Sequence, residues 1–396
     1  MKKEIGGKCY IAKSIKEMPS SGIRKFFDVA NTMEDVVSLG VGEPDFSTPW
    51  HASEAAILSI ERGQTAYTSN QGMPELRDAI SEYLRDKFDV SYRQEEILVT
   101  VGASEGIDLA LRAVLNPGEE VLVPEPSYVS YKPCVVMAGG VPVEIHTKVE
   151  NQFRVTAEEI RNAVTDKTKA IILPYPNNPT GGIMRREHLE AIAPVIQEKD
   201  LIVISDEIYA ELTYGGEPHV SIASLPGMRE RTILLNGFSK AFAMTGWRLG
   251  YAAAPSAFMD EMVKIHQYVI MCAPTMSQYA GLEALANDRR EDELARMRDA
   301  YDERRRVMVD GFRSMGLDCF EPQGAFYVFP SIQSTGLSSE EFCERLLFEN
   351  KTAVVPGTAF GRSGEGFIRC SYAYSIESIK IALDRIESFL ARLKQS

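Results

Sequence analysis

Lys240 lies where an amine nucleophile and an anion-binding site could be held together. It follows an apolar, β-rich run over residues 232–235, Ser239 directly precedes it, and Arg248 comes eight positions later. A lysine amine can form a Schiff base with a carbonyl, and a serine hydroxyl together with an arginine can bind a phosphate. The spacing therefore suits a molecule that carries both groups. Taken alone, however, the lysine is equally compatible with ordinary α/β structure.

Two further polar segments also follow apolar, strand-like runs. Asn178 comes after the run 170–173, in an Asn-Pro-Thr-Gly sequence that is either an ordinary turn or a place for an amide that donates to a phenolate oxygen. Asp206 comes after the run 201–204, where it is either a helix N-cap or a carboxylate that keeps a pyridine nitrogen protonated. Tyr209, three residues on, could donate to the same phenolate oxygen.

A glycine turn and a lone strand arginine complete the set. Gly102, Ala103 and Ser104 follow the predicted strand 97–101 and open a helix, so backbone amides there could face a phosphate, although such turns are common. Arg369 lies inside an apolar strand, where an unpaired guanidinium is costly. It therefore needs an anion, which is either a substrate α-carboxylate or an internal Asp or Glu.

Together these segments match one cofactor. They supply a phosphate cradle, phenolate donors, a partner for a pyridine nitrogen, an amine and a carboxylate clamp. Pyridoxal 5′-phosphate carries the groups that the first four would bind, and an amino acid carries the carboxylate. The combination predicts an enzyme that uses this cofactor on an amino acid.

The same motifs resemble those of pyridoxal-phosphate-dependent aminotransferases of class I/II, fold type I, in the subgroup called Iγ. The resemblance rests on residues 178–181, 205–209 and 239–248 and extends over nearly the whole chain. It implies a homodimer that exchanges the amino group of an L-amino acid with a 2-oxo acid such as 2-oxoglutarate, with ping-pong kinetics. The run 21–26 (Ser-Gly-Ile-Arg-Lys-Phe) points to aspartate, aromatic or acyl-diaminopimelate aminotransferases.

The resemblance also assigns roles to individual residues. It implies Lys240, Asp206 and Tyr209 as catalytic residues, with Lys240 bound covalently to the cofactor until an amino acid displaces it. Cofactor binding is implied for Tyr67 (from a second subunit), Gly102, Ala103, Ser104, Tyr128 (stacked on the ring), Asn178, Asp206, Tyr209, Ser239, Lys240 and Arg248. Substrate binding is implied for Gly40, Asn178 and Arg369.

The chain differs from the family pattern at two points, and it offers no sign of a metal site. Many relatives carry a phosphate-binding Ser or Thr three positions before the lysine, and this chain has Gly237 there. No second arginine dedicated to an acidic substrate side chain is identifiable, which leaves the amino donor open. The five histidines show no metal-ligand spacing, so no metal site is predicted.

Strand and helix signals alternate along the chain, which predicts an α/β fold. We expect a large domain, with a mostly parallel seven-stranded sheet between helices, and a small α+β domain. The predicted divisions are an N-terminal arm over 1–45 that packs with the small domain, a cofactor-binding domain over 46–290 and a small domain over 291–396. One continuous helical segment is predicted over 277–315. The other predicted strands are 120–124, 141–145, 325–329 and 367–371, and the other helices are 75–87, 104–115 and 339–350.

Composition restricts the partners and the compartment. The 396 residues carry a formal net charge of −13, which argues against a nucleic-acid or anionic-membrane surface. The N-terminus lacks an apolar signal region, and no apolar stretch is long enough to span a bilayer. The six cysteines are scattered without a disulfide framework. These features predict a cytoplasmic protein.

Other functions remain open on the same scaffold, because fold alone does not fix chemistry. One alternative is a C–S β-lyase or an enzyme similar to aminocyclopropane-carboxylate synthases. The other is a non-catalytic regulator that senses the cofactor, which would need an added DNA-binding domain. Only a short arm precedes Gly40 here.

Overall fold

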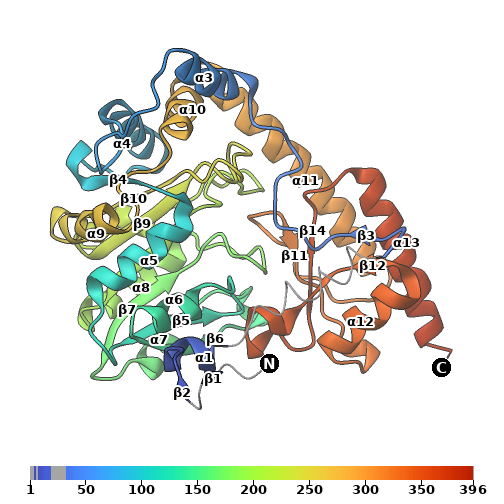
Figure 1. Ribbon diagram of the computed structural model, residues 1–396. Helices are drawn as coiled ribbons and strands as arrows, with labels where there is room; N and C mark the ends of the chain where they lie inside the picture. Colours follow the sequence, from blue (N-terminus) through green and yellow to red (C-terminus); the bar gives the residue numbers. More distant parts are fainter. Residues whose placement is uncertain (1–3, 6–7, 19–32, 396) are drawn as a thin grey trace.

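The computed structural model describes residues 4–5, 8–18 and 33–395, and it forms two lobes (Figure 1). The larger lobe is built on a seven-stranded sheet in which β10 runs antiparallel to its neighbours β4 and β9, while the remaining pairs are parallel. In spatial order the strands are β4 (Ile97–Thr100), β10 (Gly250–Ala253), β9 (Thr232–Gly237), β8 (Ile202–Asp206), β7 (Thr168–Leu173), β5 (Glu120–Glu125) and β6 (Val141–His146). The predicted mostly parallel seven-stranded sheet is confirmed.

Both faces of this sheet are buried, as the continuous apolar strands predict. Ala170 and Ile172 of β7 face the side covered by α5 (Gly102–Val114), α6 (Tyr131–Met137) and α9 (Ser256–Val269). Ile171, between them, packs on the opposite side, against α7 (Ala157–Ala163) and α8 (Arg186–Glu198). On that same side, at the other end of the sheet, lie α3 (Trp50–Glu61), α4 (Pro74–Phe88) and α10 (Thr275–Ala286).

β10 has no counterpart among the predicted strands. Its sequence is Gly-Tyr-Ala-Ala, and glycine and alanine are poor strand formers. The pairing to β4 and β9 on both sides holds it in the sheet. Because β10 is the only antiparallel strand of this sheet, the carboxyl ends of the other six strands lie along one edge.

The predicted continuous helix over 277–315 is wrong. The structure has two helices, α10 and α11 (Arg290–Ser314), and the chain between them turns at Asn287. Asn287 has extended backbone angles, and its side-chain oxygen accepts the Arg289 N–H at 3.0 Å. Such a local bond competes with helical hydrogen bonding, and the sequence pattern does not reveal it.

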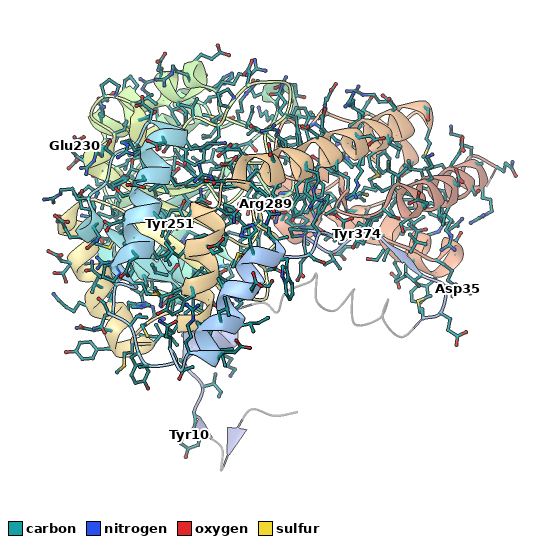
Figure 2. All side chains as sticks on the ribbon, turned by 90° about the horizontal axis from the view of Figure 1, so that it is seen from above. Tyr10, Asp35, Glu230, Tyr251, Arg289 and Tyr374 are labelled. Atoms are coloured by element: carbon teal, nitrogen blue, oxygen red, sulfur yellow. The ribbon has the colours of Figure 1, made fainter. Side chains whose placement is uncertain are left out.

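Helix α11 passes from one hydrophobic core to the other. Leu294 packs with the core of the larger lobe, whereas Met297, one turn later, packs with that of the smaller lobe. Figure 2 shows Arg289, just before α11, near the middle of the molecule, with Tyr251 in the larger lobe. This crossing supports a division near residue 291, which we keep as a proposal.

The smaller lobe has an antiparallel sheet in the order β11 (Tyr327–Val328), β14 (Ile368–Ser371), β13 (Val355–Pro356), covered by α11, α12 (Ser339–Asn350) and α13 (Ile376–Leu393). The predicted helix 339–350 and the strand near 367–371 are confirmed. The predicted strand 325–329 is shorter, because Ala325 has a positive φ of 57° and its N–H bonds to Leu212 of the larger lobe.

The N-terminal arm divides between the lobes. β3 (Val37–Ser38) pairs with β12 (Thr352–Ala353) of the smaller lobe, as predicted. In contrast, α1 (Lys13–Glu17) contacts α6 of the larger lobe, beside the β1 (Glu4–Ile5) and β2 (Lys8–Cys9) hairpin in Figure 1. The expected packing of the arm on the small domain is therefore wrong for α1. The run 21–26 lies outside the described residues.

Within the described residues, none of the helices combines the length and the apolar character that crossing a bilayer requires.

Candidate active site

Several of the predicted site residues lie at the edge of the sheet that is formed by the carboxyl ends of the parallel strands. Asp206 is the last residue of β8, and Lys240 follows β9, which is the neighbouring strand. Gly102 follows β4, and Asn178 follows β7. In an α/β sheet, ligands bind beyond these strand ends. Residues that are up to 138 positions apart in the chain (from Gly102 to Lys240) are thus placed along one edge.

Lys240 has the properties of a nucleophilic amine. Its Nζ donates to the Gly42 carbonyl at 2.7 Å. Burial is the main cause that lowers the pKa of Lys240 to about 8; the positive charges of Arg369 and Arg248 also lower this pKa, and the negative charges of Glu43 and Asp206 oppose the change. A much larger share of the amine is therefore neutral near physiological pH than for an exposed lysine.

Asp206 is a buried carboxylate that accepts two hydrogen bonds. The Tyr131 hydroxyl donates to Oδ2 at 2.7 Å, and the Ile208 N–H donates to Oδ1 at 3.2 Å. Burial raises the pKa of Asp206 above its ordinary value, whereas these two bonds and the charge of Lys240 lower it. A turn, not a helix, follows Asp206, so the alternative of a helix N-cap does not hold. A cationic ring nitrogen would favour the ionised form.

Arg369 is buried, and no described carboxylate forms an ion pair with it. Its Nη1 donates to Asn178 Oδ1 at 3.0 Å, and its Nη2 donates to the Gly40 carbonyl. The guanidinium lies 4.6 Å from the ring centre of Tyr327 and 4.8 Å from that of Phe360. Nε has no hydrogen-bond partner among the described residues. The internal Asp or Glu that the sequence left open is therefore not found, and the positive charge remains available for an anion.

Tyr209 forms a pair with a residue that the sequence did not single out. Its hydroxyl lies 2.9 Å from that of Tyr327, whose ring also contacts Arg369. Tyr327 therefore joins the predicted phenolate donor to the predicted carboxylate clamp. It was missed because an aromatic residue in a strand-like run is typical of a core, and the pairing spans 118 positions. Tyr131, which bonds to Asp206, begins α6 and was missed because this pairing spans 75 positions.

The turn between β4 and α5 forms a concave backbone surface. Helix α5 begins at Gly102, two residues before the predicted start, and Gly102 has a φ of 73°. A Cβ atom at this position would lie 2.6 Å from Nη2 of Arg248. The amides of Ala103 and Ser104 have no intrahelical partners, because they lie in the first turn of the helix. Backbone donors and one guanidinium thus lie together, as a phosphate requires.

Gly237 has a structural reason to be glycine. A Cβ atom there would lie 2.7 Å from the Gly250 Cα and 3.0 Å from the Leu249 carbonyl oxygen. The close pairing of β9 with β10 therefore leaves no room here for the Ser or Thr that the resemblance led us to expect. Ser239, which is buried, is the serine that remains beside Lys240.

Tyr67 and Tyr128 are among the predicted cofactor residues that no described polar contact brings into the cluster. Tyr67 is 79% exposed. Tyr128 packs edge to face on Tyr131, with 5.6 Å between the ring centres. This contact places Tyr128 beside the residue that binds Asp206.

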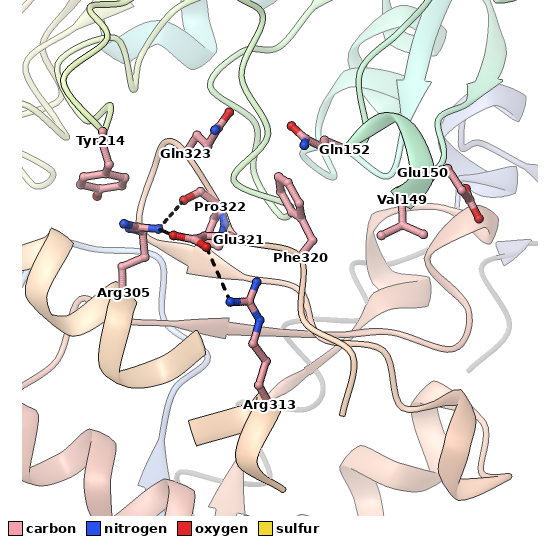
Figure 3. Close-up of a pocket in the computed structure, with 11 residues that line it drawn as sticks. Val149, Glu150, Gln152, Tyr214, Arg305, Arg313, Phe320, Glu321, Pro322 and Gln323 are labelled. Atoms are coloured by element: carbon pink, nitrogen blue, oxygen red, sulfur yellow. Dashed lines mark hydrogen bonds and ion pairs between the residues drawn. The ribbon is translucent and has the colours of Figure 1, made fainter. Parts of the chain in front are cut away.

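The cavity in Figure 3, of about 600 Å³, lies apart from these residues. Arg305 and Arg313 both point toward Glu321, with nitrogen–oxygen distances of 2.9 Å and 3.6 Å. Since both arginines are already paired, the cavity offers no free cation to an anionic ligand. None of the predicted site residues lines it.

In the part of the chain that the structure describes, one group of side chains has ligand atoms close enough to hold a metal ion. The ligand atoms of Glu125, Glu144 and His146 lie within 4.8 Å of one another. However, the Lys132 ammonium contacts both carboxylates. A protein cation thus already compensates their charge, and we assign no metal site there.

Comparisons with known proteins agree with this geometry. Residues 34–386 match the family model described as aminotransferase class I and II. The chain belongs to the class I and II aminotransferases. It is 55% identical to the putative aminotransferase YugH of Bacillus subtilis, with 96% of this chain and 98% of that protein covered. It is 50% identical to an aspartate aminotransferase of Pyrococcus abyssi, with 94% and 96% covered. The crystal structure of an aromatic aminotransferase from Pyrococcus horikoshii superposes with a TM-score of 0.90 at 47% identity, with 94% of this chain and 100% of that chain covered.

Enzymes of this family use pyridoxal 5′-phosphate, and this chain is a transaminase that depends on it. The residues present fit the cofactor on three counts. The absence of a side chain at Gly102 lets the Arg248 guanidinium approach the backbone of the turn, Lys240 offers a buried amine with a lowered pKa, and Asp206 is a buried carboxylate.

Proposed function

We propose that this transaminase exchanges the amino group of aspartate, an aromatic amino acid or a related L-amino acid with a 2-oxo acid such as 2-oxoglutarate. The observation that carries the proposal is Arg369, a buried guanidinium that pairs with no carboxylate among the described residues and whose charge acts on the amine of Lys240. Two of the similar proteins are an aspartate aminotransferase and an aromatic aminotransferase, which supports these two donor classes.

Arg369 binds the α-carboxylate of the amino acid in this proposal. Its contacts with Asn178 and with the Gly40 carbonyl fix the plane of the guanidinium before the substrate arrives. A preorganised guanidinium binds both oxygens of a carboxylate in parallel and so fixes the orientation of Cα. Because Asn178 Oδ1 accepts from Arg369, its amide nitrogen is left to donate to the phenolate oxygen of the cofactor, together with Tyr209.

Lys240 moves the proton. Bound pyridoxal phosphate supplies an electron-withdrawing ring that stabilises the negative charge at Cα when its proton leaves. The neutral Lys240 amine would accept the Cα proton of the bound amino acid on Nζ and later give it up again. Asp206, held by Tyr131, stabilises a proton on the ring nitrogen. In the same proposal Ala103, Ser104, Ser239 and Arg248 hold the phosphate, and Tyr128 stacks on the ring.

We further propose a homodimer with Tyr67 contributed across the interface. Tyr67, Trp50, Tyr268 and Val269 are 79%, 69%, 85% and 65% exposed, which is unusual for large apolar side chains. A second copy of the chain would cover them. Mixing Lys240→Ala subunits with Tyr67→Ala subunits tests this, because only a shared interface restores activity to two inactive proteins.

Cytoplasmic location remains part of the proposal. Cys134, Cys272, Cys319, Cys343 and Cys370 are free thiols in the structure. Thiols that stay reduced are typical of an intracellular protein.

The deciding experiment offers the holoenzyme a panel of L-amino acids and follows the cofactor absorbance in each half-reaction. Aspartate or aromatic donors should convert the cofactor, and 2-oxoglutarate should convert it back. Lys240→Ala should abolish turnover. Pyruvate and ammonia formed from cystathionine without amino transfer would instead favour a C–S lyase.

A further inference from the structure

We propose that Glu105 and His266 are positioning residues that hold the β4–α5 turn in the shape that binds the cofactor phosphate. The inference rests on the proposed function, since it assumes that the amides of Ala103 and Ser104 bind this phosphate. Neither Glu105 nor His266 belongs to the site described above. The pair is distinct from that site because Glu105 contacts the Val101 N–H and His266, and neither of these groups is among the predicted cofactor or substrate contacts.

Glu105 folds back onto the start of its own helix. One carboxylate oxygen accepts the Val101 N–H at 2.5 Å, and the other lies 2.8 Å from His266 Nδ1. Both oxygens therefore face N–H groups behind the turn. This orientation matters because an outward carboxylate in the first turn of α5 would repel a phosphate at the same helix end.

His266 anchors Glu105 to the body of the lobe. It lies on α9, which packs along α5, and its side chain is fully buried. Nε2 has no hydrogen-bond partner among the described residues, so Glu105 is its one polar contact there. A proton on Nδ1 lets the ring donate to Glu105. An apolar residue would fill the same space without leaving a buried nitrogen unsatisfied, which indicates that the contact with Glu105 is what the histidine provides.

The turn is held at two points. The Thr100 hydroxyl donates to the Gly102 carbonyl at 2.9 Å on the strand side, and Glu105 holds the Val101 N–H from the helix side. Between them, Gly102 has a positive φ and allows more backbone freedom than other residues. Without the Glu105 contact, the Thr100 hydroxyl would be the remaining one of these two side-chain hydrogen bonds that fix the directions of the Ala103 and Ser104 amides. Hydrogen bonds to a phosphate weaken steeply when such donors are misdirected.

The test compares two cofactor forms that differ only in the phosphate. The dissociation constants of pyridoxal 5′-phosphate and of pyridoxal are measured on the full-length apoprotein for wild type and variants. Glu105→Ala should raise the dissociation constant of pyridoxal phosphate by about tenfold or more, as expected for the loss of a charge-assisted hydrogen bond. The dissociation constant of pyridoxal should change by less than about twofold. Glu105→Gln, which keeps an acceptor for Val101, should recover most of the loss. His266→Leu should shift the ratio of the two constants in the same direction.

Glu159→Ala is the matched control. Glu159 accepts the Thr156 N–H at 2.8 Å at the start of α7, so this variant removes a similar helix-start contact away from the site. It should leave the ratio of the two constants at the wild-type value. Equal losses for both cofactor forms in Glu105→Ala, or no loss, would overturn the positioning role. A wild-type protein that does not prefer pyridoxal phosphate over pyridoxal would instead overturn the proposed phosphate cradle itself.

Discussion

Replacing Tyr131 with Phe removes one hydroxyl group and tests how Asp206 is kept ionised. The hydroxyl donates to Asp206 at 2.7 Å, and both side chains are buried. A hydrogen bond to a charged group contributes about 1.5–3 kcal/mol, which corresponds to about a tenfold to hundredfold change in rate if the bond is needed in the transition state. Since this bond lowers the pKa of Asp206 against the effect of burial, its loss raises that pKa further.

The assay is the half-reaction of the Tyr131→Phe holoenzyme with an L-amino acid, followed across pH. We expect the rate of Cα proton removal to fall about tenfold or more. The acidic limb of the pH profile should also move to higher pH, because a carboxyl with a raised pKa needs a higher pH to ionise. A Cα-deuterated substrate should show a larger isotope effect in the variant, since proton removal becomes more rate-limiting.

Tyr175→Phe is the control for this experiment. The Tyr175 hydroxyl is also buried, but it bonds to the backbone of Val155 and Phe153 rather than to a carboxylate. This variant should lose stability without a shift in the pH profile. The reasoning is refuted if Tyr131→Phe keeps the wild-type rate and pH profile, or if Tyr175→Phe changes the profile to the same extent.

Three further predictions concern single positions. Arg369→Lys should lower kcat/KM for L-amino acids by about tenfold to hundredfold, because lysine cannot bind both carboxylate oxygens in parallel, while an amine substrate without a carboxylate should be unaffected. The rate at which the apoprotein captures pyridoxal phosphate should rise with pH and level off above the Lys240 pKa of about 8; a rate that is still rising at about pH 10, near the ordinary lysine pKa, would contradict this. Gly237→Ser should lower the free energy of unfolding by about 1–3 kcal/mol in denaturant titrations, through overpacking. Gly246→Ser, where no atom lies within 4 Å of an added Cβ, should be nearly neutral, and equal losses in the two variants would count against the packing argument.

The strands and helices that position the site could be predicted from local patterns. The run 97–101 became β4, and the helix predicted over 75–87 is α4. The predictions failed where a local hydrogen bond or a neighbouring strand determines the secondary structure. Asn287 ends a helix that the apolar pattern would continue, and β10 is a strand only because β4 and β9 flank it. Neither effect is visible in composition or periodicity.

The amino-acid sequence by itself determined which polar residues follow the strands, and it predicted that these residues bear the chemistry. Lys240, Asp206 and Asn178 each follow an apolar strand, and polar residues at the carboxyl ends of parallel strands meet at one edge. Only the tertiary structure decided what holds them in place. Tyr131 reaches Asp206 across 75 positions, and Tyr327 reaches Tyr209 across 118. Such partners are aromatic residues without a distinguishing local pattern, and contacts over long sequence separations follow from the packing of the whole chain.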